Sequence, residues 1–436
     1  MHDNIVKLAE LTHVGGSDED KLALAFAEEH SGNLRYVAAW GRWLAWDGTR
    51  WIADDTLHTF DRVRSLCREV SAKASAQIVT AVERLARADR RLAATSDQWD
   101  LDPWLLNTPG GVINLKTGRV GSHKPSDYMT KITSIAPDGN CPTATWDAFL
   151  DRVTDGDAHL VGFLQRMTGY ALTGSTQEHA LFFLHGSGAN GKSTFINAVT
   201  ALAGDYHRAA AIETFTASQN ERHPTDLAGL RGARLVTSVE TEEGRRWAES
   251  KIKALTGGDK IAARFMRQDF FEFTPTFKLV IAGNHKPGLR SVDEAIRRRF
   301  HLVPFTVVIP PRERDKNLGD RLRTEWPGIL AWMIDGCIEW QERGLSPPKA
   351  VVDATAAYLD AEDAMAAWLD EVGTHDLEAW EPTKTLFASW KEWTDNAGEY
   401  AGTMKRFVQN LETRGLVPER KKHARGFRGF HIGLDR

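Results

Sequence analysis

Residues 186–193 read Gly-Ser-Gly-Ala-Asn-Gly-Lys-Ser and directly follow the apolar run Leu-Phe-Phe-Leu at 181–184. This apolar run predicts a buried strand, and residues 194–202 have the apolar spacing of a helix. A glycine-rich turn between a strand and a helix can surround phosphates with backbone N–H groups, and the helix N-terminus favours their negative charge. The sequence therefore predicts a nucleoside triphosphate site at this turn.

Two side chains of the turn have predicted roles. Lys192 can reach the β and γ oxygens of the triphosphate, and the Ser193 hydroxyl can ligate Mg²⁺. ATP and Mg²⁺ are therefore the expected cofactors. The residues expected to contact ATP are Gly186, Ser187, Gly188, Ala189, Asn190, Gly191, Lys192, Ser193 and Thr194.

Composition excludes several other classes of protein. The chain has 436 residues, 42% of them hydrophobic, and a formal net charge of −4, which is ordinary for a soluble protein of several domains. Its three cysteines form no CxxC pair, so neither a disulfide framework nor a zinc site is indicated. We expect a cytoplasmic protein with no membrane partner, because neither an export signal nor a membrane-spanning run is evident.

Apolar runs that alternate with helical patterns predict the fold class. Strands are expected at 181–184, 234–239, 277–282 and 301–305, which indicates an α/β core of three layers around a parallel sheet. The last 55 residues follow the order helix, helix, hairpin, as in a winged helix. The predicted domains are a mixed α/β region at 1–140, a helical adaptor at 141–177, an ATPase at 178–345, and a helical linker with a winged helix at 346–436.

A triphosphate site of this kind needs an acidic side chain near the end of a neighbouring strand, to hold Mg²⁺ and orient water. Glu240 follows the strand at 234–239 and is the first candidate for this metal-linked acid or base. Glu242 is the second candidate. Asn284 follows the strand at 277–282, where its amide can hydrogen-bond the attacking water or the γ-phosphate, although Asn is also common in turns.

The order of these motifs resembles the superfamily 3 helicases, within them the phage and plasmid primase-helicase branch that includes the poxvirus primase-helicase. The segments that carry the similarity are 240–244, 251–260, 273–278, 283–287 and 297–305, with 106–115 and 127–131 upstream. The resemblance implies an AAA+-like core in which residues 186–193 form Walker A, Glu240 lies in Walker B and Asn284 is the polar sensor. Walker B usually has two adjacent acids, but Thr241 follows Glu240, so the second acid stays open.

The resemblance also implies DNA contacts and a ring. Residues 260–271 fall at the position of the family's pore hairpin, although a solvated surface hairpin would have a similar sequence. Its candidate DNA-binding residues are Lys260, Arg264 and Arg267, with Phe265 or Phe270 for base stacking. Arg298 is the expected arginine finger, with Arg299 the second candidate. A finger that acts on a neighbouring subunit requires a ring, and the family implies a homohexamer.

A basic cluster near the C-terminus is the other candidate DNA contact. Residues 405–436 contain nine basic and three acidic side chains, a local charge of 9 − 3 = +6. The candidates are Lys405 and Arg406 in the expected recognition helix, and Lys421, Lys422, Arg425 and Arg428 in the wing. A solubilising basic tail is the alternative interpretation.

The function indicated is an ATP-dependent DNA helicase that moves on single-stranded or forked DNA during replication of a phage, plasmid or other mobile element. The alternative is a replication initiator or loader that uses ATP as an assembly switch, without processive unwinding. A small-molecule kinase would leave Asn284 and the basic tail unexplained. Residues 1–140 lack the paired acids of a primase, so we expect a separate primase or polymerase as partner.

Overall fold

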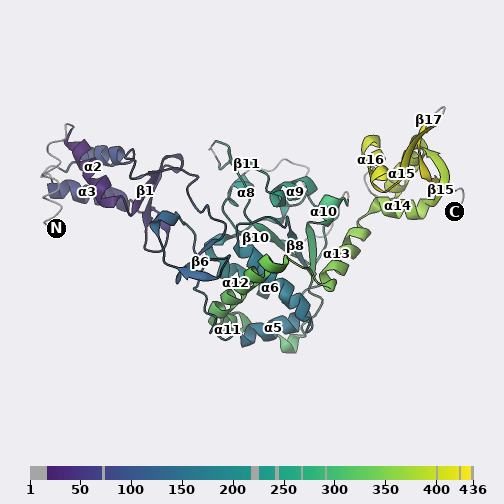
Figure 1. The fold of residues 1–436 in the computed structure, drawn as a ribbon, viewed down its shortest axis with the longest axis horizontal. Helices are drawn as coiled ribbons and strands as arrows, with labels where there is room; N and C mark the ends of the chain where they lie inside the picture. Colours follow the sequence, from purple (N-terminus) through teal and green to yellow (C-terminus); the bar gives the residue numbers. More distant parts are fainter. Residues whose placement is uncertain are drawn as a thin grey trace.

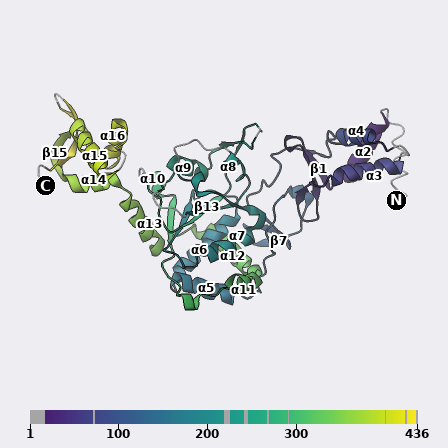
Figure 2. The same cartoon turned by 180° about the vertical axis from the view of Figure 1, so that it is seen from behind.

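The computed structural model describes residues 17–70, 74–217, 225–240, 245–266, 269–289, 292–398, 401–421 and 424–433. Figure 1 shows three parts along the chain, with the N-terminal and C-terminal parts on opposite sides of a central α/β part. The view from behind in Figure 2 shows the same arrangement. We call these the N-terminal part (17–94), the central part (105–361) and the C-terminal part (364–433).

The N-terminal part combines helices with a small sheet whose strand order is β3-β2-β1-β4. Its elements are α2 (Asp18–His30), β1 (Leu34–Val37), β2 (Arg42–Trp46), β3 (Trp51–Ala53), α3 (His58–Val70), α4 (Ala76–Ala86) and β4 (Ala93–Ala94). The turn at Asp47-Gly48 connects β2 and β3, which pair antiparallel as a hairpin. In this first sheet β4 pairs parallel with β1. A second sheet, in which all pairs are antiparallel, follows and is made of β5 (Leu105–Thr108), β6 (Gly111–Asn114) and β7 (Arg119–Gly121).

A five-stranded, all-parallel sheet forms the centre of the molecule, with the order β14-β8-β13-β10-β9. Its strands are β8 (Leu181–His185), β9 (His207–Ala209), β10 (Leu235–Glu240), β13 (Lys278–Gly283) and β14 (Phe300–Pro304). The prediction of an α/β protein with a parallel sheet is therefore confirmed. Four of the strands begin and end within one residue of the expected positions, and β9 at the edge was not expected.

Alternating side chains of each strand bury against opposite layers of helices, because successive residues of a strand point to opposite faces. Phe182 and Leu184 of β8 belong to one hydrophobic cluster, and Leu181 and Phe183 belong to another. The first layer contains α5 (Ala144–Thr154), α6 (Ala158–Leu172), α7 (Lys192–Ala203), α11 (Leu318–Thr324) and α12 (Trp326–Arg343). The second contains α8 (Thr225–Ala228), α9 (Glu249–Gly257), α10 (Glu294–Arg297) and α13 (Lys349–Ala361).

The helices expected to form an adaptor pack directly against this sheet. Trp146 of α5 stacks on Phe195 of α7, with ring centroids 5.7 Å apart. On α6, Gly169 lies so close to α12 that a Cβ atom would be 2.1 Å from the backbone nitrogen of Cys337. The helices α5 and α6 therefore share a core with the ATPase sheet, and the domain boundary at 177/178 stays a prediction.

The C-terminal part contains α14 (Ala364–Val372), β15 (Gly373–Pro382), α15 (Thr383–Ala397), α16 (Met404–Thr413), β16 (Val417–Lys421) and β17 (Ala424–Ile432). Its three strands form a sheet in the order β15-β17-β16. The helical segment that enters this part is interrupted, because α13 ends at Ala361 and the Asp363 side chain caps α14 by accepting a hydrogen bond from Ala366 N. The winged-helix assignment stays a prediction.

Candidate nucleotide-binding site

The glycine-rich turn follows the carboxyl end of β8, and its backbone packs closely against neighbouring atoms at two glycines. A Cβ atom on Gly186 would lie 2.1 Å from the carbonyl oxygen of Phe305, just beyond β14. Gly191 has φ +84 and immediately precedes α7, and a Cβ atom there would lie 2.5 Å from Val153 Cγ1. These two positions require glycine, so the turn's conformation is fixed by sterics.

The turn offers unpaired backbone donors to an anion. Within the described part of the chain, the backbone N–H groups of residues 187–193 donate no hydrogen bond. Residues 187–191 form the turn and residues 192–193 begin α7, where the helix dipole adds positive potential. The residues present therefore fit the phosphates of a nucleotide, which would accept hydrogen bonds from these donors.

Lys192 and Asn284, for each of which a contact with the γ-phosphate was among the predicted roles, lie in contact with one another. Lys192 is only 6% exposed, and its ammonium donates to Gly186 O (2.6 Å), Asn190 Oδ1 (3.2 Å) and Asn284 Oδ1 (3.1 Å). Burial lowers the pKa of Lys192. Among the described residues, three carbonyl-type oxygens and no carboxylate contact this cation, so a phosphate can replace these oxygens without breaking an ion pair between described groups.

Asn190 also has a structural contact that sequence reasoning missed. We expected it among the residues that contact ATP, but its amide nitrogen donates to Phe305 O (2.9 Å) while its oxygen accepts from Lys192. The side chain is 3% exposed. Asn190 therefore links Lys192 to the residue after β14 through two hydrogen bonds. Only the tertiary structure shows that these residues are close.

His185 is a second residue that the sequence did not single out. It ends β8, and its Nε2 lies 3.2 Å from the carbonyl oxygen of Asn284. Burial lowers the pKa of His185, and the neighbouring charge of Lys286 adds to this effect. A neutral imidazole thus packs at the edge of the sheet where the turn and Asn284 meet.

The predicted metal ligands lie at the same edge of the sheet. Ser193 is exposed in the first turn of α7. Glu240 ends β10 and is the Cα partner of Gly283, directly before Asn284. Glu242 lies outside the described residues. Among the residues described, no group of three His, Cys, Asp or Glu side chains could hold a metal ion. A Mg²⁺ ion here would depend on nucleotide oxygens together with Ser193 and Glu240.

The structure distinguishes the three consecutive arginines that follow α10. The guanidinium of Arg297 forms ion pairs with Asp360 (3.3 Å) and Asp363 (3.6 Å). Arg299 is 6% exposed and donates to Thr256 Oγ1 (3.1 Å) and Ala295 O (2.8 Å). Arg298 is exposed, and its side chain makes no hydrogen bond or ion pair within the described residues. Of the two finger candidates, Arg298 is the one whose charge is available to a neighbour.

The predicted pore hairpin is a pair of short antiparallel strands, β11 (Ile261–Ala263) and β12 (Phe271–Phe273). Lys260 is exposed directly before β11. The Arg264 guanidinium lies over the ring of Phe270, 4.8 Å from its centroid, and that ring is 60% exposed. Arg267 lies outside the described residues. The connection between the strands thus offers a cation and an exposed aromatic face together.

The basic residues of the C-terminal part lie mainly on the β16–β17 hairpin. Lys421, Arg425 and Arg428 are exposed, and Lys422 lies outside the described residues. Lys421 Nζ lies 4.8 Å from the Trp380 ring centroid, and Arg428 pairs with Glu378 (2.7 Å). Lys405 and Arg406 lie near the start of α16. These candidates form a group separate from the nucleotide site.

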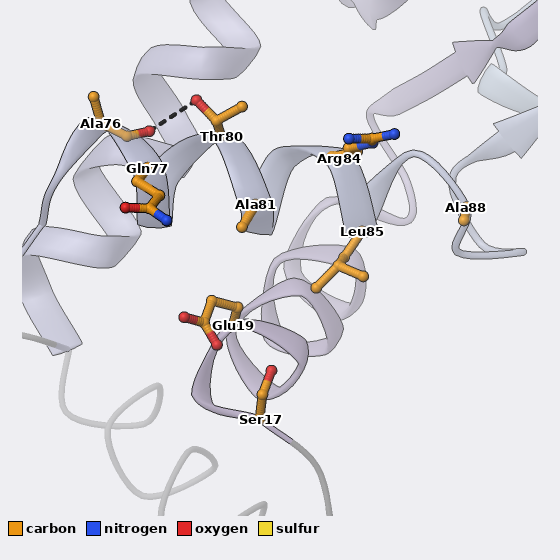
Figure 3. A pocket seen from close by; sticks show the side chains of 9 residues that line it. All are labelled: Ser17, Glu19, Ala76, Gln77, Thr80, Ala81, Arg84, Leu85 and Ala88. Atoms are coloured by element: carbon orange, nitrogen blue, oxygen red, sulfur yellow. Dashed lines mark hydrogen bonds between the residues drawn. The ribbon is translucent and has the colours of Figure 1, made fainter.

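A hollow in the N-terminal part lies apart from these sites. It is formed between the start of α2 and the length of α4, and Figure 3 shows its lining. The side chains that line it are Ser17, Glu19, Ala76, Gln77, Thr80, Ala81, Arg84, Leu85 and Ala88. None of the predicted site residues is among them. Elsewhere in the chain, none of the described helices is long and apolar enough to cross a membrane.

Comparison with known proteins finds two matching family models. Residues 23–155 match the family described as "D5 N terminal like", and residues 184–299 match a "Family of unknown function (DUF5906)". Two viral proteins, each named "Putative helicase", are similar: L207/L206 of Acanthamoeba polyphaga mimivirus and 022R of Frog virus 3. The first is 24% identical over 67% of this chain and 33% of its own length, the second 25% over 79% and 36%. The chain thus spans about a third of each relative's length.

A solved structure shares the fold. The apo structure of the NrS-1 C terminal region (305-718) matches 96% of this chain and 100% of its own, with a TM-score of 0.53 and 11% identity. At this identity the likeness concerns the fold alone. The two matched regions are typical of superfamily 3 primase-helicases, so the resemblance indicated by the motif order is confirmed.

Proposed function

We propose, from the premise that the chain resembles the superfamily 3 primase-helicases, that it is an ATP-dependent DNA helicase. It would act as a ring that moves on single-stranded DNA in the replication of a phage, plasmid or other mobile element. The viral relatives support the helicase assignment through their printed names, although the match covers only about a third of each relative's length.

The observation that carries the proposal is the contact between Lys192 and Asn284 at the mouth of the phosphate-binding turn. The two side chains come from positions 92 residues apart, and their atoms lie 3.1 Å from one another. When phosphates replace the oxygens around Lys192, the Asn284 amide is released from the ammonium. It can then hold the attacking water or the γ-phosphate, so one event both binds ATP and prepares the polar sensor.

The rest of the catalytic site would come from the neighbouring strand and the neighbouring subunit. Glu240, at the end of β10, would orient the attacking water. Mg²⁺, when bound with ATP, neutralises charge that develops on the phosphates. Arg298 would extend from an adjacent subunit toward the γ-phosphate, since its side chain forms no ion pair or hydrogen bond with the residues that the structure describes. An arginine finger of this kind contributes about 10³-fold or more in rate.

Two surfaces would contact DNA. The β11–β12 hairpin presents Arg264 beside an exposed Phe270 ring, and Lys260 lies directly before β11. A cation beside an aromatic ring suits the phosphates and bases of a single strand. The C-terminal part would act as a winged helix, with α16 in a groove of duplex DNA and the β16–β17 hairpin on its backbone.

The test is strand displacement from a forked duplex, measured together with ATP turnover. Lys192→Ala should abolish turnover because the lysine that binds the phosphates is lost. Arg298→Ala should abolish turnover while ATP binding survives. Arg264→Ala should preserve turnover but lower the strands displaced per ATP.

Matched controls come from exposed residues with the same charge. Lys349 and Arg312 are both 87% exposed and lie outside the nucleotide site. Lys349→Ala and Arg312→Ala should therefore behave as the wild type. ATP hydrolysis that never displaces a strand would favour the initiator or loader, and turnover that is stimulated by a metabolite and indifferent to DNA would favour a kinase.

A further inference from the structure

Asp363 lies at a junction between the ATPase core and the C-terminal part. It occupies the break between α13 and α14, and Figure 1 shows α13 running from the central part to α14. Its side chain is 6% exposed and caps α14 through the hydrogen bond from Ala366 N. A buried carboxylate in this position needs further partners, because its desolvation is costly.

Two arginines from different parts of the molecule supply these partners. Arg414, at the end of α16, donates from Nη2 to Asp363 Oδ1. Arg297, at the end of α10, places Nη2 3.6 Å from Asp363 Oδ2. One carboxylate therefore binds both the C-terminal part and the residue that directly precedes Arg298.

A second set of contacts joins the same end of α13 to the segment that follows Asn284. The Tyr358 hydroxyl donates to Pro287 O and accepts from Trp247 Nε1 (2.9 Å). Leu289 N donates to Glu362 Oε2 (2.8 Å). The segment after the polar sensor and the helix before Arg298 are thus held by residues 358–363, which are the last turn of α13 and the break that follows it.

We propose that Asp363 is a positioning residue that couples engagement of DNA by the C-terminal part to the placement of Arg298. This inference rests on the proposed function, since it assumes that DNA contacts the C-terminal part and that Arg298 acts on ATP. Arg414 and Arg297 share the carboxylate in the structure described. When DNA draws the C-terminal part away, Arg414 leaves and the carboxylate becomes available to Arg297 alone, which shifts α10 and Arg298.

The coupling has a direct electrostatic cause. Two guanidinium groups on one buried carboxylate weaken each other's binding, because like charges repel and the carboxylate has few acceptor positions left after it caps α14. Removing one guanidinium strengthens the other contact. Arg414 differs from the exposed basic residues of the β16–β17 hairpin, because its guanidinium pairs with Asp363.

Asp363→Asn and Arg414→Gln are the variants that test this inference. Asparagine caps helices about as well as aspartate, so Asp363→Asn removes the charge and keeps the start of α14. Arg414→Gln leaves the cap untouched altogether. Asp353→Asn is the matched control, because Asp353 lies on α13, the helix that leads to Asp363, in an exposed i,i+4 pair with Lys349.

The readout is the ratio of ATP turnover with and without forked DNA, alongside DNA affinity and melting temperature. We expect Asp363→Asn and Arg414→Gln to lower this ratio about fivefold or more. Arg414→Gln should bind DNA at least as tightly as the wild type, because DNA no longer has to break the contact with Asp363. The double variant should lose no more than either single variant, because both changes break the same contact. Asp353→Asn should keep the wild-type ratio.

Three results would overturn the inference. The first is a wild-type ratio in both variants, and the second is an additive loss in the double variant. The third is a wild-type chain whose turnover DNA does not stimulate, and this result would contradict the proposed function as well. If wild-type DNA stimulation persists in both variants, only the role of Asp363 fails.

Discussion

A single methyl group at Gly186 should displace the phosphate-binding turn from its position against Phe305 and Asn190. The Cβ atom of Gly186→Ala would lie 2.1 Å from Phe305 O and 2.2 Å from Asn190 Nδ2. Real Cβ atoms essentially never approach heavy atoms closer than 3.0 Å, so the turn must move by at least 3.0 − 2.1 = 0.9 Å. Neither neighbour can yield freely, because Asn190 itself donates to Phe305 O.

A displacement of this size affects catalysis more than folding. Overpacking at one position costs about 1–3 kcal/mol of unfolding free energy. A misplacement of about 1 Å in a catalytic site can lower the rate about 100-fold. We therefore expect Gly186→Ala to remain folded and to lose about two orders of magnitude in ATP turnover, because Gly186 O also accepts from the Lys192 ammonium.

Steady-state ATP hydrolysis and thermal denaturation, with and without ATP, check this prediction. Gly319→Ala is the matched control, since Gly319 lies in α11 with nothing within 4 Å of the added atom. It should keep full turnover and gain slightly in stability, because alanine is the better helix former. Turnover at the wild-type rate in Gly186→Ala would refute the reasoning, since catalysis would then not depend on the close packing of Gly186 against Phe305 and Asn190.

Three further predictions concern the core, pH and assembly. Gly169→Ala should lower the unfolding free energy by about 3 kcal/mol, because the added atom meets the backbone of α12 at 2.1 Å; chemical denaturation measures this. Burial between aromatic rings lowers the pKa of His301 to about 4, so the folded state favours the neutral imidazole. Stability should fall as the pH drops from about 6.5 toward 4, by up to about 3 kcal/mol, and His301→Phe should remove this part of the pH dependence in denaturation curves. Mixing Lys192→Ala with Arg298→Ala should restore about a quarter of wild-type ATP turnover, because about one interface in four would then pair an intact turn with an intact finger. A mixture as inactive as its components would contradict a finger supplied by the neighbour.

Much of the central sheet could be predicted because its information is local. The strands β8 and β13 are mainly apolar runs buried on both faces, and most residues of β10 and β14 are buried too. The glycine turn is recognisable because close neighbours at Gly186 and Gly191 leave no room for a side chain. Glu240 and Asn284 could be paired in advance because the carboxyl ends of neighbouring parallel strands lie at one edge. The predicted roles of these site residues still await experiment.

Other features depend on tertiary contacts that no local pattern contains. The strand β15 carries charged residues and no clear alternation, and it forms because it pairs with β17. Gly373 permits this pairing, since a Cβ atom there would lie 2.0 Å from Phe430 Cζ. The break at Asp363 likewise depends on Arg297 and Arg414, which are distant in sequence.

The three arginines at 297–299 illustrate the same limit. They are chemically identical, so the sequence alone could not decide which of them is available to a neighbour. Arg297 is committed to acidic residues of the α13–α14 junction, and Arg299 to the end of α9 through Thr256. Burial and distant partners, which only the fold supplies, leave Arg298 exposed.

Real-time strand displacement by the wild-type chain tests the central claim most directly. The substrate is a labelled forked duplex, incubated with ATP or with a non-hydrolysable ATP analogue, while ATP hydrolysis is followed in the same reaction. The account predicts that strands separate with ATP, remain paired with the analogue, and separate in proportion to the ATP consumed. Hydrolysis that leaves the duplex intact, or equal separation with the analogue, would contradict it.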